Sequence, residues 1–221
     1  MPRAFTEAER ETIRERLITA GRKLFSRYGL KKTTVEELSH AAGIAKGTFY
    51  LFFPSKEALY AEVLLQEAPC MMNELIADSF AATDDVRAAI VRYLKGLVKL
   101  IETNELVKSL ASDPYTMSQL LETLDLKELQ TSRSKLFSPL LEIIAEAQKD
   151  GEIVEGDPVE IAQMFGVIKV LPSYKDQFPP EQYPRLVDRL ARVIADGLTC
   201  PAKINPGPDL ARDLSSEKET A

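Results

Sequence analysis

The chain has 221 residues, of which 45% are hydrophobic, so it is long enough to bury a core and is not expected to be disordered. It contains one histidine, His40, and two cysteines, Cys70 and Cys200, that lie far apart. This composition gives no sign of a metal site, because a zinc site needs several such ligands at short spacing. The N-terminus has no apolar signal core and no run of 18 apolar residues occurs, so we expect a cytoplasmic protein without a transmembrane helix.

Charge is unevenly distributed along the chain. The net charge of −6 argues against a general nucleic-acid binder. Residues 1–60, however, hold 11 basic and 7 acidic side chains, a net +4, whereas the remainder holds 17 basic and 27 acidic side chains, a net −10. This asymmetry fits a small basic module on an acidic body, although ordinary variation of surface charge explains it equally well.

The first predicted helix begins at a capping box, Thr6-x-x-Glu9, in which the Thr hydroxyl and the Glu carboxylate satisfy each other's free backbone amides. Gly29 should end this helix, because glycine readily adopts the left-handed conformation that closes a helix. Apolar residues recur at three- and four-residue spacing and are expected on its inner face: Ile13, Leu17, Ala20, Leu24 and Tyr28.

A second capping box, Thr34-x-x-Glu37, opens a short helix that a turn at Gly43 follows. A third helix should run from about residue 45 to 50 and end before Pro54, since proline cannot continue the amide ladder. Two short helices joined by a glycine-containing turn form a helix-turn-helix unit, whose second helix enters the major groove of DNA. The same pattern also occurs in plain helical bundles.

The run from Ala42 to Leu59, AGIAKGTFYLFFPSKEAL, resembles the DNA-binding signature of the TetR family of bacterial repressors. AGRKLF at 20–25, together with Tyr28-Gly29 and Thr33-Thr34, extends the resemblance over residues 12–65 without a gap. Beyond residue 65 the resemblance lies only in length and helical pattern. It implies an all-α fold with a three-helix helix-turn-helix head and a larger helical-bundle body for ligand binding and dimerisation.

The resemblance also assigns roles at the DNA groove. Lys46 and Thr48 would face base edges, where a lysine can reach guanine O6 or N7. Gly47 would let the backbone approach DNA closely. His40 is expected on the outer face of the second helix, exposed to solvent.

Phosphate contacts are implied for three further residues, Thr34, Tyr50 and Lys56. Lys56 would lie at a helix N-terminus, where the helix dipole favours an anion.

Two positions depart from the family pattern. Ala45 replaces a frequent serine and removes a side-chain cap from the third helix. Phe52 replaces a frequent tyrosine or histidine and removes a polar contact. Phe49 and Phe53 are expected in the core.

A fourth helix, capped by Ser55, should bend or break between Leu65 and Pro69. In the family this helix joins head and body. We hypothesise that the bend near Pro69 lies on the route by which the body repositions the head; a static kink is an equally good interpretation.

The rest of the chain has helical periodicity without strand-like alternation or a glycine-rich phosphate loop, giving about nine helices in all. The further helices are expected as follows: one capped by Asp84 and running to about residue 101; one at 105–112; one at 113–150, kinked or divided at Pro139; one from Asp157 to Leu171, stopped by Pro172; and one at 181–197, closed by Gly197.

We expect three parts: a DNA-binding domain at 1–54, a ligand-binding and dimerisation domain at 55–198, and a flexible tail at 199–221. Family resemblance implies a homodimer through segments 158–171 and 181–197, although these apolar stripes also fit a monomer core. A small apolar effector is expected between helices, with no cofactor. Its candidate contacts, each more often plain core, are Met71, Met72, Tyr93, Met117, Phe137 and Phe165.

The sequence therefore predicts a ligand-responsive regulator that represses by occupying palindromic operator DNA as a homodimer. An alternative is a helical adaptor that kept the shape of the head but lost specific DNA binding. An enzyme is not expected, because no nucleophile-base pair or metal cluster is recognisable.

Overall fold

The structure is a computed structural model that describes residues 5–111 and 126–199, with the side chains of 109–111 and 126–135 excepted. Nine α-helices and one 3-10 helix account for most of this part of the chain, and no strand occurs in it. The all-α expectation is confirmed. None of the described helices is sufficiently long and apolar to cross a bilayer.

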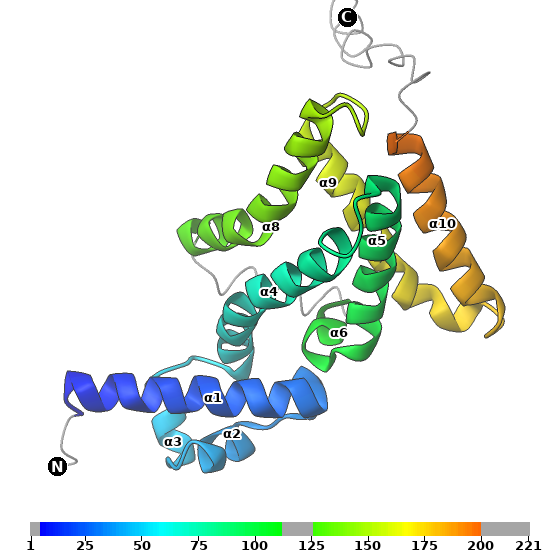
Figure 1. Ribbon diagram of the computed structural model, residues 1–221. Coiled ribbons are helices and arrows are strands. Elements are labelled where there is room, and N and C mark those ends of the chain that lie inside the picture. Colours follow the sequence, from blue (N-terminus) through cyan, green and yellow to red (C-terminus); the bar gives the residue numbers. More distant parts are fainter. Residues whose placement is uncertain (1–4, 112–125, 200–221) are drawn as a thin grey trace, which may run out of the picture.

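Three helices at one end of the molecule form the head: α1 (Glu7–Lys32), α2 (Val35–Ala41) and α3 (Lys46–Phe49) (Figure 1). The capping box at Thr6 forms as predicted, with both reciprocal hydrogen bonds present. Gly29 takes a positive φ of 72°, but the chain makes another helical turn before α1 ends. The expectation that Tyr28 lies on the inner face is wrong: it is exposed, while Phe25 is fully buried against Tyr60.

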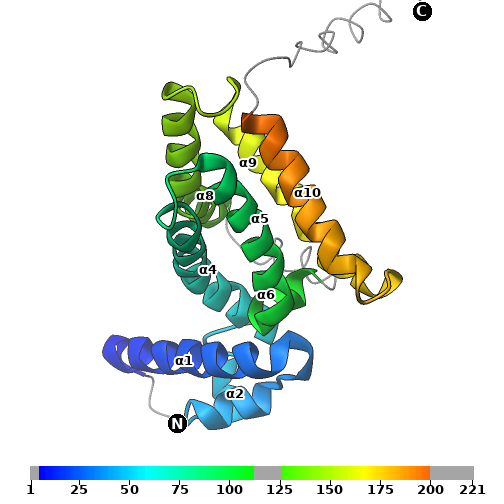
Figure 2. The ribbon, with the colours of Figure 1, turned by 45° about the vertical axis from the view of Figure 1, so that its right-hand side comes forward.

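Helix α4 (Lys56–Phe80) leads from the head into the body, as Figure 2 shows. Its start is capped by the Ser55 hydroxyl, which accepts from the Ala58 amide. Of the bend or break expected between Leu65 and Pro69, the break does not occur, because α4 is continuous through Pro69. The helix does change direction along its length, as Figures 1 and 2 show, and a proline that removes one amide hydrogen bond favours such a bend.

The body consists of the following elements after α4: α5 (Val86–Thr103), α6 (Glu105–Ala111), α8 (Leu126–Lys149), α9 (Pro158–Val167), the 3-10 helix η1 (Ile168–Gln177) and α10 (Gln182–Thr199). Asp157 and Pro158 start α9 as predicted. The cap of α5 is Asp85 and not Asp84, since the Asp85 carboxylate accepts from the Ala88 amide. Pro139 does not divide α8, but Figure 1 shows this helix bent along its length, so of the two expected outcomes the kink is the one that fits.

The C-terminal helices differ from the prediction in their boundaries. Pro172 does not end a helix; it lies inside η1, whose looser hydrogen bonding tolerates a missing amide. Gly197 likewise does not close α10, which continues to Thr199 and packs along α5.

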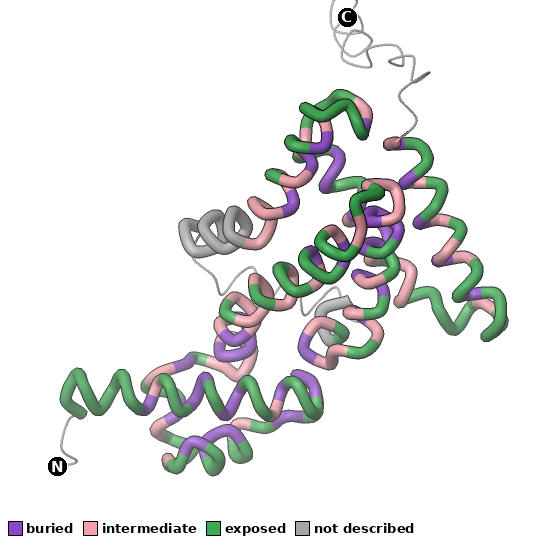
Figure 3. The backbone as a smooth tube through the Cα atoms, in the orientation of Figure 1, coloured by how far each residue is buried: buried purple, intermediate pink, exposed green. Residues whose placement is uncertain are grey.

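Two hydrophobic cores result, one in the head and one in the body. Leu106 of α6 belongs to the head core, so α6 touches the head although it follows α5 of the body. Figure 3 shows buried and exposed residues alternating along α1 and α10, as expected for helices with one face on a core. The head is therefore fixed to the body at two places, through α4 and through α6.

Candidate nucleic-acid interface

The helix-turn-helix is held by its caps and its turn. The Thr34 hydroxyl accepts from the Glu37 amide, and the Glu37 carboxylate accepts from the Thr34 amide and hydroxyl, each at 2.8 Å. Gly43 takes a φ of 70°, and no atom lies within 4 Å of the place that a Cβ would occupy, so backbone conformation alone requires glycine there. The predicted turn is confirmed.

Helix α3 is short and is anchored by its aromatic residues. Phe49 is fully buried and Phe53 nearly so, with ring centres 6.0 Å apart, which confirms that both are core. Ala45 is the N-cap and makes no side-chain hydrogen bond, as its departure from the family pattern indicates. Because Phe49 faces inward, Lys46, Gly47 and Tyr50 are exposed and Thr48 is half-buried.

Lys46 and Glu36 form an ion pair between α3 and α2. Hydrogen bonding to Lys46 lowers the pKa of the Glu36 carboxyl, and the same contact raises the pKa of the Lys46 ammonium. Both side chains are more than half exposed, so water and salt weaken this pair, and a phosphate or base can compete for the lysine.

Lys56 differs from the other candidate DNA contacts in that it already has partners in the protein. Its Nζ donates to the backbone oxygens of Leu30 and Thr33, at 2.8 and 2.9 Å. These carbonyls lie between α1 and α2, so the lysine ties the start of α4 to that connection. No local sequence signal indicates this contact, because the partners lie 23 and 26 residues away.

Arginines of α1 hold aromatic residues near α3, a role that sequence reasoning missed. The Arg10 guanidinium lies 5.3 Å from the centre of the Phe52 ring, and Arg14 lies 5.3 Å from that of Phe53. Arg14 also forms a bidentate ion pair with Glu62 of α4. Phe52, the position that departs from the family pattern, is thus half-buried under an arginine.

The candidate effector residues of the body do not form one group. Tyr93 and Phe165 pack together with ring centres 5.8 Å apart, and Phe80 extends this aromatic cluster. Burial raises the pKa of the Tyr93 hydroxyl. Phe137 lies elsewhere, under the ammonium of Lys169, whose pKa burial lowers.

The methionine candidates are also dispersed. Met72 packs at the edge of the body core. Met71 packs on the head core, and its sulfur accepts from the Asn104 amide at 3.2 Å. Met117 lies outside the described residues. Within the described ranges, no cluster of three or more His, Cys, Asp or Glu side chains has the arrangement of a metal site.

Known proteins match the head, and some match most of the chain. A sequence model of the family described as bacterial regulatory proteins, tetR family, matches residues 17–63. HTH-type transcriptional regulator RutR of Escherichia coli O157:H7 is 27% identical over 198 residues, covering 82% of this chain and 88% of the relative. Over 62 residues the identity to the uncharacterized HTH-type transcriptional regulator YerO of Bacillus subtilis is 48%, covering 28% of this chain and 22% of that protein.

Structural similarity extends over the body. The crystal structure of RolR in complex with resorcinol has a TM-score of 0.62 at 19% identity, covering 86% of this chain and 96% of RolR. This likeness concerns the fold alone. The head supplies the matching signature and the observed helix-turn-helix, and the body supplies the matching architecture. The head therefore carries the helix-turn-helix domain of the TetR family, and the chain is similar over most of its length to helix-turn-helix transcriptional regulators.

Proposed function

We propose that this regulator is a ligand-responsive repressor that binds a palindromic operator as a homodimer and is released by a small molecule. The observation that carries the proposal is the exposed side of α3. Lys46 and Tyr50 project from a helix whose opposite side, at Phe49, is locked in the head core. A recognition helix needs this combination of an exposed polar surface and a rigid support.

The proposed DNA contacts are of two kinds, contacts to base edges and contacts to backbone phosphates. In this proposal Lys46 and Thr48 contact base edges. Gly47 leaves space for the DNA backbone, since nothing lies within 4 Å of its Cβ position. Thr34 and Tyr50 supply hydroxyls for phosphates, which fix the register of the protein on the duplex. The resemblance implies a phosphate contact for Lys56 too, but we assign this lysine to holding the start of α4, because its ammonium already donates to two backbone carbonyls.

Exposed apolar residues support a dimer through α9, η1 and α10, the predicted segments 158–171 and 181–197. An apolar surface of this kind favours burial against a second copy, and an isologous dimer suits a palindrome. The six exposed apolar residues on these elements are Val159, Met164, Val167, Val170, Tyr174 and Val193.

For the effector we propose the aromatic cluster of Tyr93 and Phe165, with Met72 at its edge. RolR, which shares the fold, was crystallised with resorcinol, a small aromatic molecule. We retain the division into a DNA-binding domain at 1–54, a body at 55–198 and a tail at 199–221. A regulator of this type acts on cytoplasmic DNA.

A mobility-shift assay with DNA from upstream of the protein's own gene tests the proposal. We expect specific binding that weakens steeply with salt, because bound phosphates release counterions. Lys46→Met combined with Tyr50→Phe should abolish it without unfolding the protein, whereas Lys149→Gln, an exposed lysine on α8, should have no effect. Equal binding of specific and random DNA, or no effect of the double substitution, would instead favour the helical adaptor.

A further inference from the structure

A cavity of about 740 Å³ lies between α5, the end of η1 and the start of α10. It is distinct from the aromatic cluster, because neither Tyr93 nor Phe165 lines it. A cavity of this size accommodates a small organic molecule. Its walls are largely apolar and include two aromatic rings and two prolines: Val98, Phe178, Pro180, Tyr183, Pro184 and Val187.

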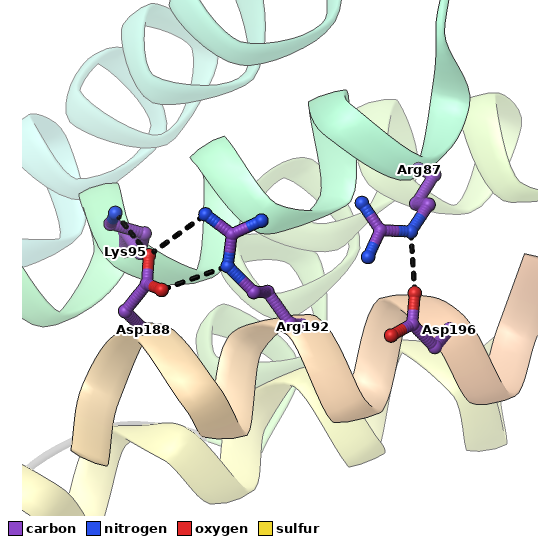
Figure 4. Close-up of polar contacts among 5 residues, drawn as sticks. All are labelled: Arg87, Lys95, Asp188, Arg192 and Asp196. Atoms are coloured by element: carbon purple, nitrogen blue, oxygen red, sulfur yellow. Dashed lines mark hydrogen bonds and ion pairs between the residues drawn. The ribbon is translucent and has the colours of Figure 1, made fainter. Parts of the chain in front are cut away.

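Positive charge predominates around the cavity. Three lysines line it, against the two carboxylates of Glu102 and Asp176. Lys175 is occupied by Glu102, at 2.9 Å, and Lys95 by Asp188 of α10, at 2.6 Å, which Figure 4 shows. Lys99 remains, and within the described residues it forms no ion pair.

The surroundings of Lys99 add to this preference for an anion. Arg92, Lys95 and Lys99 follow one another on the exposed side of α5, and the helix has no acidic residue before Glu102. The exposed carboxylates of Glu74 and Asp78 on α4 and of Asp176 on η1 also lie around these cations, but none of them forms an ion pair with Lys99. An anion entering the cavity is attracted mainly by Lys99, the lining lysine that no carboxylate of the described residues neutralises.

Tyr183 adds a polar group to the wall of the cavity. Its side chain is 4% exposed, and its hydroxyl interacts with the carboxylate of Glu102. Burial and this carboxylate raise the pKa of the hydroxyl to about 12. The hydroxyl therefore stays protonated at neutral pH, and a ligand acceptor would compete with Glu102 for it.

We propose that this cavity binds a small molecule with an apolar, ring-sized body and one anionic group, with Lys99 as the ion-pair partner of that group. The site lies on the side of α10 that faces α5, where Val187 is buried, whereas Val193 of the same helix is exposed. On η1 the cavity residues Lys175 and Asp176 follow directly after Tyr174, which belongs to the surface proposed for dimerisation.

An occupant of this cavity has a direct connection to the head, a step that rests on the proposed function. Helix α5 ends at Thr103 and continues through Asn104 into α6. The Leu106 carbonyl of α6 accepts from the Tyr60 hydroxyl inside the head core. A ligand that fixes α5 against η1 and α10 therefore also fixes the position of α6 on the head.

Binding is tested with two fluorescent probes that share a ring system, on the full chain without DNA. Anilinonaphthalene sulfonate carries the anionic group and N-phenylnaphthylamine lacks it. We expect the sulfonate to bind more tightly and Lys99→Gln to weaken it by about 2- to 5-fold, the effect of one exposed ion pair, while the neutral probe is unaffected. Val98→Phe, which fills the cavity, should weaken both probes.

Two matched controls make the outcome decisive. Asp176→Asn removes the exposed carboxylate and should leave sulfonate affinity equal or higher, and Lys149→Gln on α8 should leave it equal. The inference fails if both probes bind equally, if Lys99→Gln has no effect, or if Asp176→Asn weakens the sulfonate. Because these titrations contain no DNA, a failed mobility shift with intact probe selectivity would refute only the proposed function.

Discussion

Substituting Lys56 by Met separates two roles that the sequence and the structure assign to one side chain. The resemblance implies a phosphate contact, whereas the structure shows Nζ on the carbonyls of Leu30 and Thr33. Met keeps most of the aliphatic stem and removes the ammonium. Hydrogen bonds from a charged donor contribute about 1.5–3 kcal/mol each when well shielded, and less where water competes.

The Lys56 side chain is half-buried, so we expect Lys56→Met to lower the free energy of unfolding by about 2 kcal/mol. In a chain of this length that corresponds to a fall in Tm of roughly 4–8 °C. Calorimetry and urea unfolding measure both quantities. Lys46→Met is the matched control: Lys46 is exposed and paired only with Glu36, so its loss should change stability by less than about 0.5 kcal/mol.

Salt dependence of DNA binding then decides between the roles. If Lys56 neutralises a phosphate, its loss reduces the slope of log affinity against log salt by about 0.9 per subunit. We expect an unchanged slope for Lys56→Met once the protein is kept folded, and a reduced affinity for Lys46→Met. An unchanged Tm together with a reduced slope for Lys56→Met would refute the structural reasoning and support the phosphate contact.

Three further predictions concern the head and the α5–α10 contact. Gly47→Ala should stabilise the free protein by up to about 1 kcal/mol, because Ala is the better helix former and nothing lies within 4 Å of its Cβ; on DNA it should lower affinity, and equal affinity in a mobility shift would remove the proposed close approach. Glu36→Gln should raise DNA affinity, since it frees Lys46 and removes a carboxylate from beside the phosphates; a fall in affinity would show that the pair positions the lysine. Asp188 has a pKa lowered to about 2 by hydrogen bonds from Arg192 and then from Lys95, so its contribution is present above pH 4 and is lost as the pH falls toward 2. Asp188→Asn should therefore unfold more easily than wild type near neutral pH and converge with it in acid, and a constant difference across urea titrations at each pH would contradict this assignment.

Much of the head could be predicted because its signals are local. A capping box involves residues three apart, and the φ of Gly43 depends on its own backbone, so both can be recognised in the sequence. Lys56 and Arg10 could not be placed in the same way, because their partners come from other helices. The polar side chains of α3 were identified by resemblance, and the structure shows that a buried Phe49 turns them outward.

Body helices were recognised, but several of their ends were not. The sequence predicted a bend or break near Pro69, a kink or division at Pro139 and a stop at Pro172. No break, division or stop occurs, and each proline lies inside a helix. The cost of one lost hydrogen bond is offset where the helix packs on neighbours over its whole length, and these packing partners cannot be identified from local sequence. For the same reason the cavity beside Lys99 was missed, since its walls come from three separate segments.

The two attachments of the head suggest different routes for a signal from the body. Pro69 lies within a continuous α4, which joins head and body covalently and packs on both, so a hinge there would have to unmake helical hydrogen bonds. Leu106 is 1% exposed in the head core, yet α6 reaches it directly from the end of α5. A small shift of α5 would move Leu106 and the carbonyl that accepts from Tyr60 without unfolding a turn of helix. On these grounds we favour α6 over the Pro69 hinge as the element through which the body acts on the head.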